Sequence, residues 1–131
     1  MIIIIEKAIK DLVVDKIELD NKFISIKEDE QGNIKMKFST GKWNQYIKFP
    51  NKVDEKNIYK VDIEVYCDCP SYTFGGYKYL GTINGYNFSE YEERRPPKKS
   101  VDKYVCKHLE SILGNFSNFV FILRDFLKDR R

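Results

Sequence analysis

Residues 59–70 read Tyr-Lys-Val-Asp-Ile-Glu-Val-Tyr-Cys-Asp-Cys-Pro, and this stretch decides the fold. Its apolar residues at the odd positions 59 to 65 point to one side, and its charged residues at positions 60, 62 and 64 point to the other. Strict alternation is typical of a strand with one buried face, so the stretch predicts an antiparallel sheet. Pro70 has no N–H to donate to a neighbouring strand, so strand pairing should end there.

The same stretch ends in a candidate metal site. The three cysteines and the single histidine of the chain form the pattern Cys67-x-Cys69 and Cys106-x-His108. Thiolate sulfur and imidazole nitrogen are standard ligands of tetrahedral zinc. In an extended chain, residues i and i+2 lie on the same side about 6.6 Å apart, close enough for both to reach one ion. We therefore predict one structural Zn²⁺ bound by Cys67, Cys69, Cys106 and His108.

The second ligand pair requires a local irregularity. Residues i and i+2 point in different directions on a regular helix, so Cys106 and His108 should lie just before a helix or in its first turn. The positive end of the helix dipole favours a thiolate there. Two alternatives stay open at this point: a disulfide between Cys67 and Cys69, and a buried, hydrogen-bonded His108 beside small apolar cysteines.

Upstream of residue 59 the sequence predicts one helix and three strands. Apolar residues at near-helical spacing predict an N-terminal helix over residues 5–17. From residue 23 the period changes to two, with Ile24 and Ile26 alternating with polar neighbours. A glycine-bearing polar turn then leads to a second alternating segment from residue 34 to 38, which predicts a hairpin. A further strand over 43–49 would place Trp43, Ile47 and Phe49 on one face.

The C-terminal part of the chain is predicted to be helical from Val105 to Leu127. Gly114-Asn115 can end a helix and Ser117-Asn118 can begin one, so one kinked helix and two helices meeting near 114–118 are both open. Residues 119–123 are apolar on every side of such a helix. We expect them to be buried, with a partner protein supplying part of the cover.

Together these elements predict an α+β fold. It consists of a small antiparallel sheet of three or four strands, a zinc knuckle leading into the C-terminal helix or helices, and a short N-terminal helix. A length of 131 residues suits a single domain, 1–131. We divide it into a helix and hairpin region (1–58), a zinc module (59–113) with a long insert (70–105), and a C-terminal helix (114–131).

The composition predicts a soluble globular protein, because 42% of the residues are hydrophobic and 33% are charged. No apolar stretch approaches the roughly 20 residues of a membrane span. Residues 1–5 lack the basic start and the cleavage site of a signal peptide. We therefore expect a cytoplasmic protein with reduced thiols, which favours a metal site over a disulfide. The net charge of +3 is too small to indicate the partner.

The insert shows no regular period, and so long an irregular segment in a small domain is usually functional. Its aromatic and basic side chains could contact protein partners in a larger assembly, bind nucleic acid, or simply cover the glycine-rich backbone of the insert. Between residues 90 and 107, six basic residues face four acidic ones, a small excess that favours assembly. The candidate contact residues are Tyr72, Phe74, Tyr77, Arg94, Arg95, Lys98 and Lys99.

Two family resemblances rest on the ligand motifs. Cys67-Asp68-Cys69-Pro70 and Cys106-Lys107-His108-Leu109 resemble the SWIM zinc finger, CxCPx(n)CxH, with a longer spacer than in compact members. In that family a strand carries the CxC pair and a helix starts at CxH, and the resemblance implies DNA binding as one function. The same motifs with a glycine-rich, aromatic insert are also similar to small zinc-binding structural proteins of tailed bacteriophages, which implies a virion location.

A catalytic role for the metal is not expected. Catalytic zinc usually has three protein ligands and an open position, whereas four ligands close the shell here and no second histidine exists to act as a base. The signature of the zinc deaminases is also absent. The sequence therefore predicts a non-enzymatic structural zinc module that acts in protein–protein assembly, and the phage resemblance implies that this assembly is a bacteriophage virion. The alternative is SWIM-type nucleic-acid binding. No small-molecule substrate or membrane partner is expected.

Overall fold

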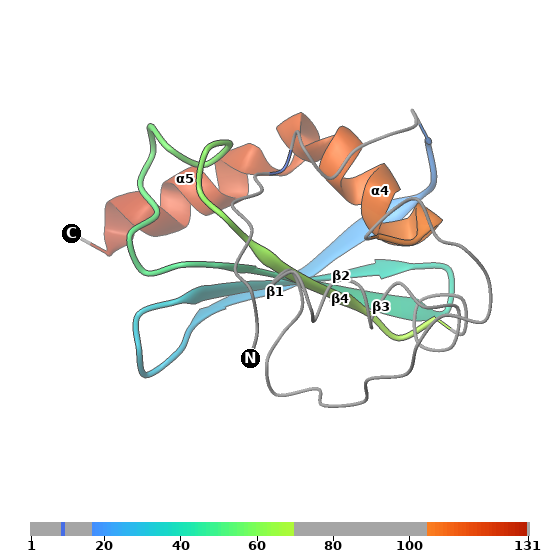
Figure 1. Ribbon diagram of the computed structural model, residues 1–131, viewed down its shortest axis with the longest axis horizontal. Coiled ribbons are helices and arrows are strands. Elements are labelled where there is room, and N and C mark those ends of the chain that lie inside the picture. The colour runs from blue at the N-terminus through green and yellow to red at the C-terminus, as the bar shows by residue number, and fades with distance from the viewer. Residues whose placement is uncertain (1–8, 10–16, 70–104, 131) are drawn as a thin grey trace, which may run out of the picture.

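A four-stranded antiparallel sheet is the frame of the molecule (Figure 1). The computed structural model describes residues 9, 17–69 and 105–130. The sheet has the order β1-β2-β3-β4, so each strand pairs with its neighbours in sequence, which confirms the predicted antiparallel sheet. Its strands are β1 (Asn21–Glu28), β2 (Ile34–Thr40), β3 (Trp43–Phe49) and β4 (Glu64–Cys67).

Two helices follow Cys106, one of the four predicted ligands, and lie on one side of the sheet (Figure 1). They are α4 (Lys107–Gly114) and α5 (Val120–Asp129), joined by a 3₁₀ turn, η1 (Phe116–Asn118). The chain thus adopts the two-helix alternative. The expected N-cap at Ser117-Asn118 is wrong, because those residues belong to η1 and Phe119 occupies the N-cap position of α5. The ring of Phe119 instead packs edge-on against Phe38, 5.0 Å between centroids.

The hydrophobic core lies between the helices and one face of the sheet. Alternate residues of β2 and β3 are fully buried, as the period of two predicts. The helices α4 and α5 cover these strand residues with apolar side chains at helical spacing, among them Leu109, Ile112 and Leu123. The largest fully buried side chains are Phe38, Phe49, Phe116, Ile34, Met36, Ile47, Ile58 and Ile63.

A β-bulge in β1 corrects the predicted phase of that strand. Phe23 faces Phe38 and Ser25 faces Lys37, so Ile24 is an extra residue without a partner across the ladder. The bulge shifts the alternation by one position. Ile26 consequently packs against the core, while Ile24 is 51% exposed instead of sharing its face.

The predicted strand at residues 59–65 is also shorter than expected, because β4 begins only at Glu64. Asp54 Oδ1 accepts hydrogen bonds from the N–H groups of Lys56 (2.8 Å) and Asn57 (2.9 Å). The carbonyl of Asn57 then accepts the N–H groups of residues 60 and 61 at 2.8 and 3.0 Å. Because these backbone donors are satisfied within consecutive turns, they are not available to a strand partner. The burial of Val61, Ile63 and Val65 is nevertheless as predicted.

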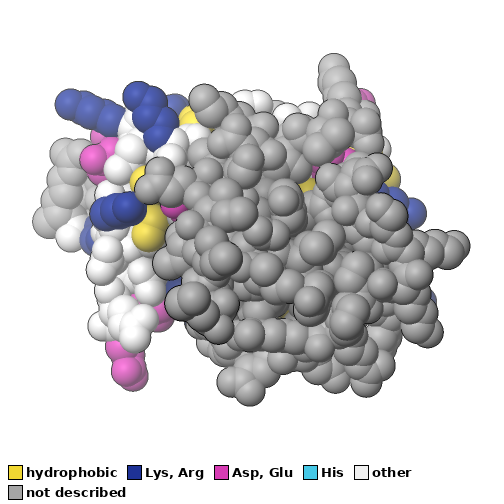
Figure 2. Space-filling view, viewed as in Figure 1, with side chains coloured by type: hydrophobic (Ala, Val, Ile, Leu, Met, Phe, Trp, Pro, Cys, Tyr) yellow, Lys and Arg dark blue, Asp and Glu magenta, His cyan; other side chains and the backbone are white. Residues whose placement is uncertain are grey.

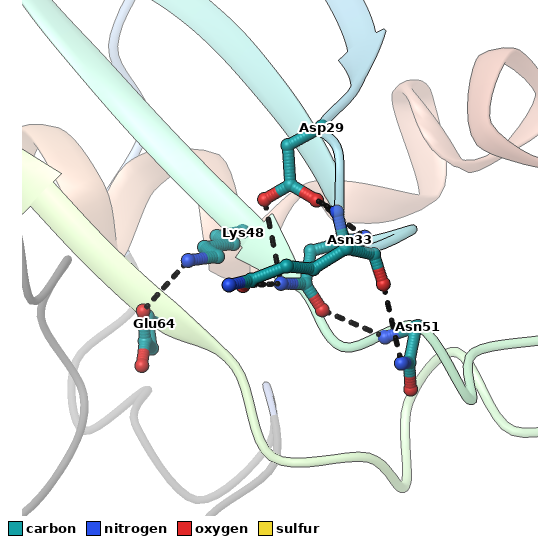
Figure 3. A network of polar contacts seen from close by, with 6 residues as sticks. Asp29, Asn33, Lys48, Asn51 and Glu64 are labelled. Atoms are coloured by element: carbon teal, nitrogen blue, oxygen red, sulfur yellow. Dashed lines mark hydrogen bonds and ion pairs between the residues drawn. The ribbon is translucent and has the colours of Figure 1, made fainter.

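The β1–β2 turn is stabilised by one carboxylate (Figure 3). Asp29 Oδ1 accepts the N–H groups of Gln31 and Asn33, each at 2.9 Å, and Oδ2 accepts the Asn33 amide at 3.3 Å. Desolvation is the largest single influence and opposes ionisation, but these donors together with the nearby Lys48 charge outweigh it and hold the pKa of Asp29 below its ordinary value. Gly32 occupies the left-handed region at φ 83°. Asn33 Oδ1 also accepts the N–H of Asn51 at 3.0 Å, which ties the turn to the segment after β3.

We expect Asp29→Ala to lower the free energy of unfolding by about 1–2 kcal/mol, because two backbone donors and one amide lose a charged acceptor. Urea denaturation measures the change. Glu30→Ala is the matched control: Glu30 is an exposed residue of the same turn, and its loss should change stability by no more than about 0.5 kcal/mol. Equal midpoints for the two variants would contradict the role assigned to Asp29.

Several predictions fall on other parts of the chain. The predicted N-terminal helix lies almost wholly outside the described residues, and of its apolar positions the structure describes Ile9, which is buried, and Ile17. The insert lies outside them except for Val105. Of residues 119–123, which were expected to be buried with a partner supplying part of the cover, Val120 and Leu123 are buried within the chain, while Phe121 is 58% exposed. None of the helices in the described ranges is long and apolar enough to cross a bilayer.

Candidate metal centre

Cys67 and Cys69 lie at the end of β4, where a link to β3 fixes the direction of their side chains. Cys67 is the last residue of β4 and stands opposite Gln45 of β3. Between the cysteines, the N–H of Asp68 donates to the carbonyl of Asn44 (3.1 Å). The Asp68 carboxylate accepts the backbone N–H of Asn44 (2.7 Å) and its side-chain amide (3.2 Å). Both cysteines are at most 1% exposed.

Cys106 and His108 lie at the start of α4. Cys106 is the N-cap residue with extended backbone angles (φ −78°, ψ 173°), and its carbonyl accepts the N–H of Glu110 at 2.9 Å. His108 is the second helical residue. The change from extended to helical backbone between them allows both side chains to turn to the same point, which confirms the predicted irregularity at the helix start. Cys106 is 2% exposed, and His108 is half-buried.

The four predicted ligands meet in one cluster. Their ligand atoms all lie within 4.8 Å of one another. His108 Nδ1 is 3.9 Å from Cys67 Sγ and 3.8 Å from Cys106 Sγ. Around a tetrahedral Zn²⁺ with standard bond lengths, sulfur and nitrogen ligands stand about 3.5–3.8 Å apart. The cluster therefore has nearly the dimensions that such an ion requires. All three cysteines are free thiols, so the disulfide alternative is not what the structure contains.

Crowding and burial act on the protonation of the thiols. For Cys67, contact with Cys106 favours ionisation, but the Cys69 thiol and burial oppose it more strongly and raise the pKa to about 12. Contacts with Cys67 and Cys69, together with burial, raise the pKa of Cys106. Three thiolates this close repel one another, and desolvation adds to the cost. Burial and crowding thus favour the protonated thiol over the thiolate at Cys67 and Cys106 when no cation is bound.

Metal affinity should therefore decrease steeply with decreasing pH, because each thiol must release its proton before it binds the ion as a thiolate. With three thiols the apparent affinity should change by up to about a thousandfold per pH unit. Competition with a chelator of known affinity, repeated at neutral and mildly acidic pH, measures this slope. An affinity that does not change with pH would contradict binding through the three thiolates.

Other residues named from the sequence have no described position. All seven candidate contact residues of the insert, from Tyr72 to Lys99, lie outside the described ranges. Sequence reasoning missed Gln45, a fully buried amide beside Cys67. The available signal was its inward position on the strand, in phase with Ile47 and Phe49, where a polar side chain needs a hydrogen-bond partner.

Comparison of the chain with protein-family models, with curated proteins and with solved structures gave no match. The structure itself shows a buried Cys₃His cluster, at the junction of a strand and a helix, that could hold a metal ion.

Proposed function

We propose that the Cys₃His cluster binds one Zn²⁺ and that the ion has a structural role. The observation that carries the proposal is the convergence of four donors from two distant segments, whose ligand atoms all lie within 4.8 Å of one another. Three sulfurs and one imidazole nitrogen suit zinc better than magnesium or calcium, which prefer oxygen. The ion would fasten the end of β4 to the start of α4.

The donor set also supports a non-enzymatic role. Four protein ligands complete the tetrahedral shell and leave no open position for a water molecule. His108 is the only histidine of the chain and belongs to the cluster, so no histidine remains to act as a base. The chemistry of the site is then the joining of two chain segments.

Metal analysis tests the zinc proposal. Protein purified without chelator should contain about one zinc per chain, and Cys106→Ser should reduce this content sharply. Lys107→Ser is the matched control, because Lys107 is an exposed residue between the two ligands of α4 and should be dispensable for the metal. A wild-type protein without zinc, which also fails to bind added Zn²⁺, would overturn the proposal.

We further propose that the module works within a larger protein assembly, with a bacteriophage virion as the setting that the motif resemblance suggests. Phe121 supports this proposal, because a large aromatic side chain that is 58% exposed on α5 is the kind of residue that interface cores use. In the native source, the zinc-loaded protein should sediment with particles of high mass. Phe121→Lys should release it, while Arg124→Ala, at an exposed position of the same helix, should not. A wild-type protein that sediments only as a monomer would contradict the proposal.

Nucleic-acid binding is the second candidate. One row of the sheet places Lys27 and Lys35 side by side on neighbouring strands, where they could contact phosphates, and continues to Lys48, which is ion-paired with Glu64 of β4 at 3.7 Å. Against it, Figure 2 shows basic and acidic side chains mixed on the described part of the visible face. Salt-sensitive binding that the double reversal Arg94→Glu/Arg95→Glu abolishes would favour this candidate. No binding to DNA or RNA at low salt would exclude it.

A further inference from the structure

Gln45 is a buried polar residue in contact with the metal cluster. It lies on the inner face of β3, fully buried, and directly opposite Cys67 in the strand register. Its Nε2 is 3.4 Å from Cys67 Sγ, and its Oε1 is 2.7 Å from the Thr40 hydroxyl. A buried amide of this kind needs both partners, because an unsatisfied polar group in the core is costly. The question is which end of the amide faces the sulfur.

A chain of hydrogen bonds leads to the Gln45 amide, and it begins at a backbone N–H, which can only donate. The backbone N–H of Leu19 donates to Ser111 Oγ on α4 at 2.9 Å. The Ser111 hydroxyl in turn donates its own proton to Asn21 Oδ1, 2.8 Å away. Since Asn21 Oδ1 is the acceptor, its amide nitrogen must face the next member of the chain.

The chain of hydrogen bonds continues in the same donor-to-acceptor direction across the sheet to the sulfur. Asn21 Nδ2 donates to Thr40 Oγ1 at 2.6 Å, and the Thr40 hydroxyl donates to Gln45 Oε1 at 2.7 Å. The nitrogen of Gln45 is left to face Cys67 Sγ. All five hydrogen bonds run in one direction, from the Leu19 N–H to the sulfur, and in this orientation the Gln45 amide has a partner for both its oxygen and its nitrogen.

We propose that Gln45 is a positioning residue that donates a hydrogen bond to the metal-bound Cys67 thiolate, and that the chain from Leu19 through Thr40 keeps it a donor. The inference rests on the proposed zinc site. A donor at this place stabilises the anionic sulfur, holds it toward the ion and lowers its nucleophilicity. A carbonyl oxygen at the same place would repel the thiolate.

Thr40 should therefore influence metal binding, although it does not contact the cluster. Removal of its hydroxyl leaves the Gln45 amide free to rotate, so that the oxygen faces the sulfur for part of the time. The effect should have the same direction as loss of Gln45 and should be smaller. A role in packing alone would make Thr40→Val nearly silent at the metal, because valine has almost the same shape as threonine.

Co²⁺ is the probe for the test, because its thiolate charge-transfer absorption reports on the electrons of the ligand sulfur. In Gln45→Leu we expect the affinity for Co²⁺ to fall by about 10–100-fold, as for other residues that support metal ligands. The charge-transfer band should move to lower energy, because the sulfur lone pair loses the donor that stabilises it. Thr40→Val should shift the band less in the same direction, and Thr40→Ser should restore it.

Ile47→Val is the matched control, because Ile47 is buried on the same strand two residues from Gln45 and has no polar group. It should lower stability without moving the band. If Gln45→Leu binds Co²⁺ with the wild-type affinity and band, the inference is overturned and the zinc proposal stands. If the wild-type protein shows no thiolate band with Co²⁺, the zinc proposal fails and the inference fails with it.

Discussion

Chelation of the metal is expected to unfold the junction between β4 and α4. Structural zinc in small modules contributes an apparent binding free energy of about 10–16 kcal/mol, whereas whole domains are stable by only about 5–15 kcal/mol. The ion would join segments that are 37 residues apart at Cys69 and Cys106. Without it, four buried donors would lose their common partner. The β1–β2–β3 part has its own buried residues and should be affected less.

Amide hydrogen exchange during titration with a strong chelator measures this effect by region. Protection should be lost first at β4 and in the first turn of α4, and later at the centre of β2. Cys69→Ser without chelator should give the same pattern, which separates loss of the ion from side effects of the chelator. Uniform protection in the metal-free protein would show that the core alone holds the junction.

Phe38→Ala is expected to cause the largest loss of stability outside the metal centre, about 3–5 kcal/mol. Phe38 is fully buried on the central strand β2. Its ring packs edge-on against Phe23 of β1 at 5.9 Å and against Phe119, before α5, at 5.0 Å. The substitution removes a ring that contacts both of these, so the cavity term and the loss of aromatic contacts act together.

Urea denaturation with excess Zn²⁺ measures the effect of Phe38→Ala without interference from metal loss. Phe121→Ala is the control, because it removes the same ring from a side chain that is 58% exposed and should change stability by no more than about 0.5 kcal/mol. Similar losses for both variants would mean that Phe121 is covered in solution, for example by a second copy of the chain. Similar small changes would contradict the core position of Phe38.

Most of the fold could be predicted from the sequence because its strands alternate clearly. The strand Trp43–Phe49 was predicted with its observed bounds. The errors arose where hydrogen bonds outweigh periodicity. The sequence alone does not distinguish the extra residue Ile24 from a regular strand residue, because Ile24 and Ile26 are both apolar and a regular strand would place them on the same face. Residues 59–63 alternate correctly, but turn hydrogen bonds at Asn57 delay the start of β4.

The candidate ligands could be predicted for a different reason. Cysteine and histidine are rare in this chain, so their spacing carried the information without any knowledge of the fold. The surroundings of the cluster could not be predicted in the same way. Gln45 reaches Cys67 across a strand pair, and the polarity of its amide depends on Leu19 and Ser111, which are 92 residues apart. Such contacts exist only after the sheet and α4 have come together.

The position of the cluster also affects how the chain can change during evolution. Cys69 and Cys106 mark the two ends of residues 70–105, and their ligand atoms lie within 4.8 Å of each other. A segment that leaves and returns at one point can vary in length at little cost, because each doubling of a loop adds only about 0.6 kcal/mol of closure entropy. Insertions and deletions within 70–104 would still allow the two ligand pairs to meet at one ion. This part of the gene is therefore where we expect a lineage to acquire new partners fastest.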